Sequence, residues 1–219
     1  MSRPLPYKFS NGAVVLGQYK VAQRSGAIAA TPTALDDWAR IRWVPSTSNA
    51  KLVLIRLRCG LSISGAVTTL VQQVLQASVV RSFTSDYTTA ITNVSMVGNS
   101  GKMHANMGSS LMGATGPGIC TTAPMTTFTG TLDPAPFALD NFPLITAVTA
   151  TGTAIAGAVG IATPMKTLYE WTGLGDHPVT LSTGEGVVVE TVLTGHATGT
   201  LVLTTEWTWA EVINPFGND

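Results

Sequence analysis

Two stretches in the first third of the chain alternate apolar and polar residues, as half-buried β-strands do. They are Trp38–Val44 (WARIRWV) and Lys51–Gly60 (KLVLIRLRCG), and the turn-forming run PSTSNA separates them. The residues that share an apolar face are Ala39, Ile41 and Trp43 on the first strand and Val53, Ile55, Leu57 and Cys59 on the second. The pattern predicts an antiparallel hairpin in which Trp43 pairs with Val53, because a slip of one residue would turn a whole face outward.

The opposite face of this predicted hairpin is rich in arginine. It carries Trp38, Arg40, Arg42, Arg56 and Arg58. In the predicted register Arg40 lies across from Arg56, and directly opposed like charges destabilise a sheet. Trp38 can hold Arg58 by a cation–π contact. The remaining arginines either extend into solvent or meet acidic partners, so these five residues are our candidate protein-interface site.

A second alternating pair lies near the C-terminus. Gly184–Leu193 is followed by the polar run TGHATG and then by Thr200–Val212, which predicts another hairpin. The second strand places two leucines and two tryptophans on one face, namely Leu201, Leu203, Trp207 and Trp209. A face of that size removes several hundred Å² of apolar surface from water, at roughly 25 cal/mol per Å². We predict that it is a core strand.

The remaining segments carry weaker signals. Val67–Leu75 has the apolar spacing of a helix, but its valines and threonines leave a strand as an alternative. Residues 99–143 read as long loops around short strands. The uncharged segment Thr146–Ala162 favours a flexible or edge strand over a membrane span, because it is short and rich in threonine and glycine.

Many short strands with glycine- and proline-rich turns predict an all-β chain. We expect one β-sandwich domain over residues 1–219, with long Gly/Thr-rich loops and an extended N-terminal arm over about residues 1–10; a jelly roll is one candidate topology. The arm, Ser2–Phe9, is a second candidate contact.

Charge is unevenly distributed along the chain. Only 11% of residues are charged, against about 25% in an average soluble protein. Residues 1–102 contain eleven bases and three acids, whereas residues 103–219 contain one base and nine acids. The two halves therefore carry +8 and −8. Either the halves neutralise each other within one domain, or the chain binds copies of itself or another protein.

Residues with catalytic or metal-binding potential do not form a recognisable motif. His104, His177 and His196 lack the spacing of metal ligands, and no nucleophile elbow or phosphate loop is present. Cys59 and Cys120 read as reduced packing residues, with one bridge between them left open. We therefore expect no enzyme activity and no cofactor.

Several blocks of the sequence resemble a family of bacteriophage virion proteins. These blocks are KLVLIRLRCG, VVRSFTSDY with GNSGKMHANM, and GDHPVTLSTGEGVVVE with GTLVLTTEWTWAEV. They are similar to small capsid decoration, or cement, proteins. The resemblance implies a β-sandwich or jelly roll on the exterior of the virion capsid, assembled in the host cytoplasm.

The same resemblance implies the partners. They would be the major capsid protein and copies of the chain itself in a dimer or trimer. No membrane partner is expected, and nucleic acid is disfavoured because the isoelectric point is near neutral and no RNA- or DNA-binding motif is present. The alternative is a phage tail, fibre or spike module that recognises host carbohydrate. Trp171 is the tryptophan placed in a loop, where such a module would need an exposed aromatic residue.

Overall fold

A computed structural model describes most of the chain. The described residues are 14–29, 33–46, 49–65, 73–126, 128–142, 164–173, 177–193 and 199–213. The N-terminal arm, the segment Thr146–Ala162, His196 and residues 67–72 lie outside these ranges. Within them no helix occurs, and Val74 and Leu75 belong to a strand, so strand is the better reading of the end of Val67–Leu75.

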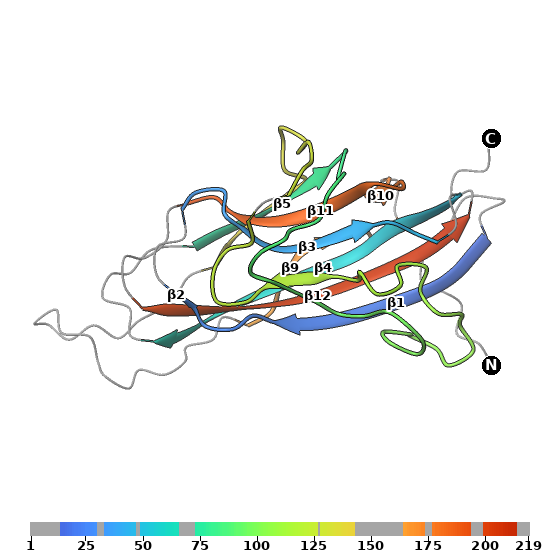
Figure 1. Ribbon diagram of the computed structural model, residues 1–219, viewed down its shortest axis with the longest axis horizontal. Coiled ribbons are helices and arrows are strands. Elements are labelled where there is room, and N and C mark those ends of the chain that lie inside the picture. Colours follow the sequence, from blue (N-terminus) through green and yellow to red (C-terminus); the bar gives the residue numbers. More distant parts are fainter. Residues whose placement is uncertain are drawn as a thin grey trace, which may run out of the picture.

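The first of two antiparallel sheets, sheet A, is built around three long strands (Figure 1). Its order is β1–β12–β4–β10, with β2 also paired to β12 and β9 to β4. The strands are β1 (Val14–Arg24), β2 (Ile28–Ala29), β4 (Ala50–Gly65), β9 (Lys166–Glu170), β10 (Thr180–Leu181) and β12 (Thr200–Ile213).

The second sheet, sheet B, packs against the first and has the order β6–β7–β3–β11–β5–β8. Its strands are β3 (Asp37–Trp43), β5 (Gln73–Val80), β6 (Ile91–Asn93), β7 (Gly118–Cys120), β8 (Ala138–Phe142) and β11 (Glu185–Thr191). The prediction of an all-β sandwich is confirmed.

The strand pairing follows the jelly-roll order. Early strands pair with late ones in a nested series: β1 with β12, β3 with β11, β4 with β9, and β5 with β8. Two further pairings, β12 with β4 and β11 with β5, complete the four-stranded centre of each sheet. The fold is thus one long hairpin wrapped into two layers.

Both predicted hairpins are wrong for one reason. Strand β3 belongs to sheet B and β4 to sheet A, and β11 and β12 are divided in the same way. The short connection after each first strand therefore crosses between the sheets instead of joining two neighbours. Trp43 lies opposite Glu185, and Leu57 lies opposite Trp207. Alternation reports that a strand has a buried face, but it does not identify the strand beside it.

A bulge in β4 also divides a predicted apolar face. The pairing with β12 passes from Arg56 directly to Leu54, which leaves Ile55 as the extra residue. Leu57 and Cys59 therefore face the main core together with Leu52 and Leu54. Val53 and Ile55 join a second apolar cluster on β4 and β12, whose other buried members are Trp171, Ala210 and Val212.

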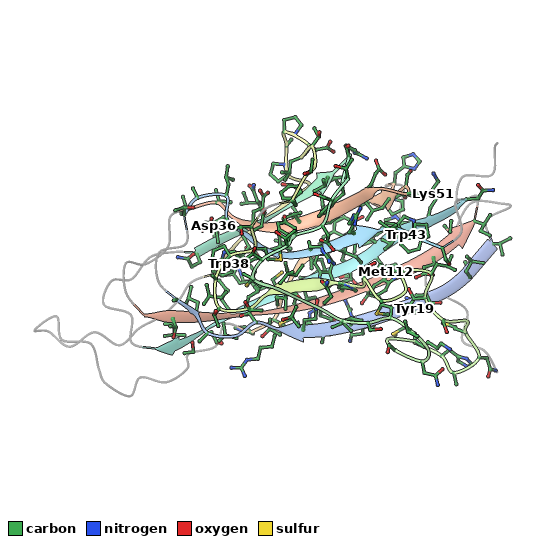
Figure 2. All side chains as sticks on the ribbon, viewed as in Figure 1. Tyr19, Asp36, Trp38, Trp43, Lys51 and Met112 are labelled. Carbon is green, nitrogen blue, oxygen red and sulfur yellow. The ribbon has the colours of Figure 1, made fainter. Side chains whose placement is uncertain are left out.

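The main core lies between the sheets and contains four fully buried tryptophans. They are Trp38, Trp43, Trp207 and Trp209, and Figure 2 shows Trp38 and Trp43 at opposite ends of β3. Trp43 Nε1 donates to the Ala50 carbonyl at 3.0 Å, and the Trp209 ring stacks on Tyr19 with centroids 5.7 Å apart. The predicted core face of β12 is confirmed, since Leu201 and Leu203 are buried too.

Both cysteines are free thiols in this core. Burial raises the pKa of the Cys59 thiol strongly, and burial also raises the pKa of Cys120 to about 12. The two side chains are therefore protonated packing residues. The bridge that the sequence left open is not formed.

A buried carboxylate attaches a long loop to the edge of the sandwich. Glu211, fully buried on β12, accepts hydrogen bonds from the Ser110 hydroxyl, from the Leu111 N–H at 2.8 Å and from Trp209 Nε1 at 3.2 Å. Burial raises the pKa of Glu211, and these three donors oppose that shift. The same loop reaches β1, where the Tyr19 hydroxyl donates to the Gly108 carbonyl at 3.0 Å.

Replacing Glu211 with Gln should destabilise the fold. The amide can no longer accept at both oxygens, so at least one buried donor loses its partner, at a cost of about 1–3 kcal/mol. Urea unfolding followed by tryptophan fluorescence would measure this loss. Glu170→Gln, at an exposed position on β9, is the matched control and should leave the unfolding midpoint unchanged. Equal midpoints for the two variants would contradict the assigned role.

Candidate protein-interaction face

The two outer faces of the sandwich differ in how they are covered. Over sheet B lie residues 81–90, 121–126 and 128–133, which we call the cover; the residues between 90 and 121 supply β6, β7 and the loop that binds Glu211. The aromatic residues of the cover, Phe83, Tyr87 and Phe128, pack together with ring centroids 4.8–5.9 Å apart. A Cβ built on Gly186 of β11 would lie 2.8 Å from the Phe83 ring, so glycine permits the close approach of the cover.

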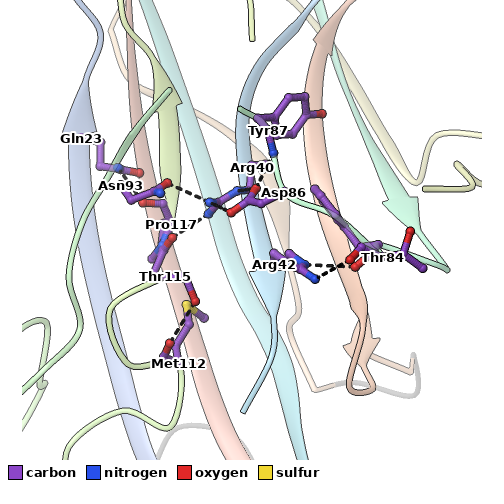
Figure 3. Close-up of polar contacts among 12 residues, drawn as sticks. Gln23, Arg40, Arg42, Thr84, Asp86, Tyr87, Asn93, Met112, Thr115 and Pro117 are labelled. Carbon is purple, nitrogen blue, oxygen red and sulfur yellow. Dashed lines mark hydrogen bonds and ion pairs between the residues drawn. The ribbon is translucent and has the colours of Figure 1, made fainter. Parts of the chain in front are cut away.

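Arg40 is a fully buried residue that fastens the cover to β3 (Figure 3). Its guanidinium binds both carboxylate oxygens of Asp86, with 2.8 Å from Nε to Oδ1. It also donates to the Gly116 carbonyl at 2.6 Å and to Asn93 Oδ1 at 2.8 Å. Such a bidentate, fully hydrogen-bonded pair suits a buried arginine. Its donors are occupied within the chain, so Arg40 is a structural residue.

Two further residues of the predicted interface also lie on the sheet B side. Trp38 is fully buried and has no free surface for a partner. Arg42 donates to the Phe83 carbonyl at 3.0 Å and to the Thr84 carbonyl at 3.2 Å. Its guanidinium carbon lies 5.5 Å from the centre of the Phe83 ring. Both residues therefore support the core or the cover.

The outer face of sheet A carries the other two predicted arginines. Arg56 and Arg58 lie on β4 beside Glu206 of β12, with Lys20 of β1 on the far side of that carboxylate. Glu206 oxygens lie 2.8 Å from Lys20 Nζ, 3.1 Å from Arg56 Nη2 and 3.7 Å from Arg58 Nη1. We call these four residues the basic face.

The basic face has more positive than negative charge, even when Glu170 of β9, the cross-strand partner of Arg56, is counted. Three cations surround one carboxylate, and each cationic side chain is 32–37% exposed, whereas that of Glu206 is 12% exposed. Partial burial would raise the pKa of Glu206, but Lys20, Arg56 and Arg58 hold it below its usual range. Glu206 is therefore ionised at neutral pH and neutralises only one of its three neighbours. The arrangement suits the binding of further carboxylates.

The predicted arginine face is therefore divided between two sides of the sandwich. Arg40 and Arg42 lie under or beside the cover, and only Arg56 and Arg58 lie on the basic face. Lys20 and Glu206 could not be predicted from the sequence as members of this site, because partners such as Arg56 and Glu206 lie 150 residues apart. The predicted pairing of Trp38 with Arg58 is wrong, because Trp38 is on β3 of sheet B and Arg58 is on β4 of sheet A.

The sorted charges of the chain partly neutralise each other inside the fold. Five ion pairs join a base of residues 1–102 to an acid of residues 103–219: three converge on Glu206, and two link Arg81 to Asp133 and Glu185. The first of the two alternatives raised by the sequence thus accounts for much of the asymmetry. The uncompensated cations of the basic face remain available to a partner.

Other candidate residues are internal or lack the required geometry. Trp171 is only 7% exposed and packs with Val53 and Ile55 on sheet A, so its ring is not an open platform for a sugar. His104 Nδ1 accepts a hydrogen bond from the Asn106 N–H at 3.2 Å. In the described ranges no three His, Cys, Asp or Glu side chains gather as metal ligands would.

Comparison with known proteins does not assign a family. The chain matches no protein-family model and no curated protein sequence at a significant level. Among the described residues, no helix is long and apolar enough to cross a membrane.

The structure predicts opposite roles for two arginines that the sequence grouped together. Arg40→Met should destabilise the protein by about 3 kcal/mol, because it leaves Asp86 and Asn93 without their buried partner. Arg56→Met should cost less than about 1 kcal/mol, because Arg56 is partly exposed. Urea unfolding of both variants would measure the difference. Similar losses for the two would show that Arg40 does not hold the cover in place.

Proposed function

We propose that the protein is a bacteriophage virion structural protein that decorates the capsid and stabilises it through protein–protein contacts. The contact surface would be the basic face, and the partner would be an acidic surface of the major capsid protein. The mechanism is interface formation without bond chemistry. This proposal keeps Arg56 and Arg58 from the sequence-based site and adds Lys20.

The observation that carries the proposal is the difference between the outer faces of the two sheets: the cover packs over sheet B, whereas the basic face of sheet A is partly exposed. The chain places residues 81–90, 121–126 and 128–133 against sheet B, where Phe83 and Tyr87 are buried and Asp86 binds Arg40. On sheet A it leaves three cations about one-third exposed around Glu206. Cations held in place by strands and by Glu206 are already oriented, so less conformational entropy is lost when a partner binds.

Two further features are consistent with a structural role in a particle. Jelly rolls are a recurring architecture of viral capsid domains, although a fold alone does not establish a function. The low content of charged side chains lowers the cost of desolvating a contact surface. Many copies on a symmetric shell would add avidity to contacts that are individually weak.

The test is charge reversal on the basic face. Arg56→Glu should weaken co-sedimentation with capsids assembled from the major capsid protein by about tenfold or more, since it converts an attraction into a repulsion. Lys102→Glu makes the same change in net charge on the loop beside β1, where Lys102 Nζ contacts Asn99. This control should bind as the unaltered protein does.

Circular dichroism must show that both variants are folded, and adding Arg58→Glu to Arg56→Glu should weaken binding further. If Arg56→Glu and Lys102→Glu bind capsids equally well, the basic face is not the contact surface. If the unaltered protein does not bind capsids at all, the decoration role itself is wrong.

A further inference from the structure

Two carboxylates oppose each other across β3 and β11, beneath the cover. Asp37 and Glu190 are cross-strand partners at a bulge in this ladder. Glu190 is 5% exposed. Asp37 is half-buried, and its Oδ1 lies out of contact with solvent and has no hydrogen-bond partner. Directly opposed like charges destabilise a sheet, and an unpartnered buried carboxylate oxygen adds to that cost.

The two carboxylates differ in their surroundings. Glu190 Oε2 accepts from Gln76 Nε2 at 3.1 Å and from the Ser78 hydroxyl at 2.9 Å, both on β5. Asp37 Oδ1 has no such donor. Of the two groups, Asp37 is therefore the one that can take up a proton at Oδ1 without displacing a hydrogen-bond donor, because Glu190 Oε2 already accepts two hydrogen bonds.

The other charged and titratable groups nearby do not provide a counter-charge for Asp37. On β3, the Arg40 guanidinium is occupied by Asp86. The preceding residue, Asp36, adds a negative charge and accepts hydrogen bonds from Thr33. From the cover, the Tyr87 hydroxyl lies near Asp37 but outside hydrogen-bond geometry.

We propose that Asp37 and Glu190 form a proton-binding site, in which Asp37 holds a proton while the cover is closed. Protonation removes the repulsion between the two strands and turns Asp37 into a hydrogen-bond donor. The Asp37 carbonyl also accepts from the Met125 N–H at 2.8 Å, so the cover is attached at the same residue. Loss of the proton should loosen this attachment.

The direction of the pH dependence follows from the environment of Asp37. Burial raises its pKa to about 7; the Tyr87 hydroxyl opposes the shift, and the charges of Glu190 and Asp36 add to it. The folded state therefore binds this proton more tightly than the unfolded chain, in which an aspartate titrates near pH 4. As pH rises between about 4 and 7, this site should raise the unfolding constant by up to about tenfold per pH unit. Above pH 7 it should add no further change.

The experiment compares urea unfolding of the full chain with that of Asp37→Asn from pH 5 to pH 8. The unfolding constant of the unaltered protein is divided by that of Asp37→Asn. This ratio isolates the site, because the other titrating groups are common to both proteins. We expect the ratio to rise with pH and to level off near pH 7. Asp36→Asn removes the neighbouring carboxylate and is the matched control; its ratio should change much less. A ratio for Asp37→Asn that is independent of pH would overturn the proposal.

A second measurement does not depend on the stability of Asp37→Asn. Carbon-13 NMR of aspartate carboxyl groups in the unaltered protein should show one resonance that titrates near pH 7, and its midpoint should move to lower pH in Glu190→Gln. The proposal fails if all aspartates titrate below pH 6. It also fails if the midpoint is the same in Glu190→Gln. Neither measurement involves capsids, so the outcome is independent of the proposed function.

Discussion

The pairing of β12 with two strands at once is the constraint on which the rest of the structure depends. β12 lies between β1 and β4 and is hydrogen-bonded to both over most of its fourteen residues. Its inner face carries Trp207 and Trp209 into the core, together with the carboxylate of Glu211, which holds a loop. Its outer face presents Glu206, around which Lys20, Arg56 and Arg58 gather. Strands that are distant in sequence meet at β12. The core, the loop attachment and the basic face therefore all depend on the same strand pairing.

Both sides of the sandwich hold buried or half-buried charges, but in different ways. Arg40 is enclosed by a carboxylate, an amide and a carbonyl, and such a pair must be complete because a missing partner leaves an uncompensated charge. Glu206 is shared among three cations that keep about a third of their surface in water, so its cluster can accept another carboxylate without breaking a buried network. The first arrangement secures the cover, and the second is open to a partner.

The sequence predicted the strands β3, β4, β11 and β12, but it did not predict β1, the division of the apolar face of β4, or which strands are neighbours. Alternation placed Ala39, Ile41 and Trp43 inside, and the structure agrees. It could not show that the chain passes from sheet B to sheet A between β3 and β4. A short polar connection can join two strands of one hairpin or two strands in different sheets equally well. The bulge at Ile55 had no signal either, since every residue from Leu52 to Ile55 is apolar. Arg40 was misplaced because arginines are rarely buried, and Asp86 lies 46 residues away.

The nested topology also explains why charge can be sorted along this chain without separating in space. A jelly roll pairs early strands with late ones, so basic β1 and β4 lie beside acidic β12, and Arg56 of β4 lies across from Glu170 of β9. A sequence with a basic first half and an acidic second half is thereby interleaved, as Glu206 between Lys20 and Arg56 shows. The same interleaving brings two acids together where β3 meets β11, at Asp37 and Glu190. In a fold that places opposite charges side by side, that pair of like charges has to be neutralised by a proton.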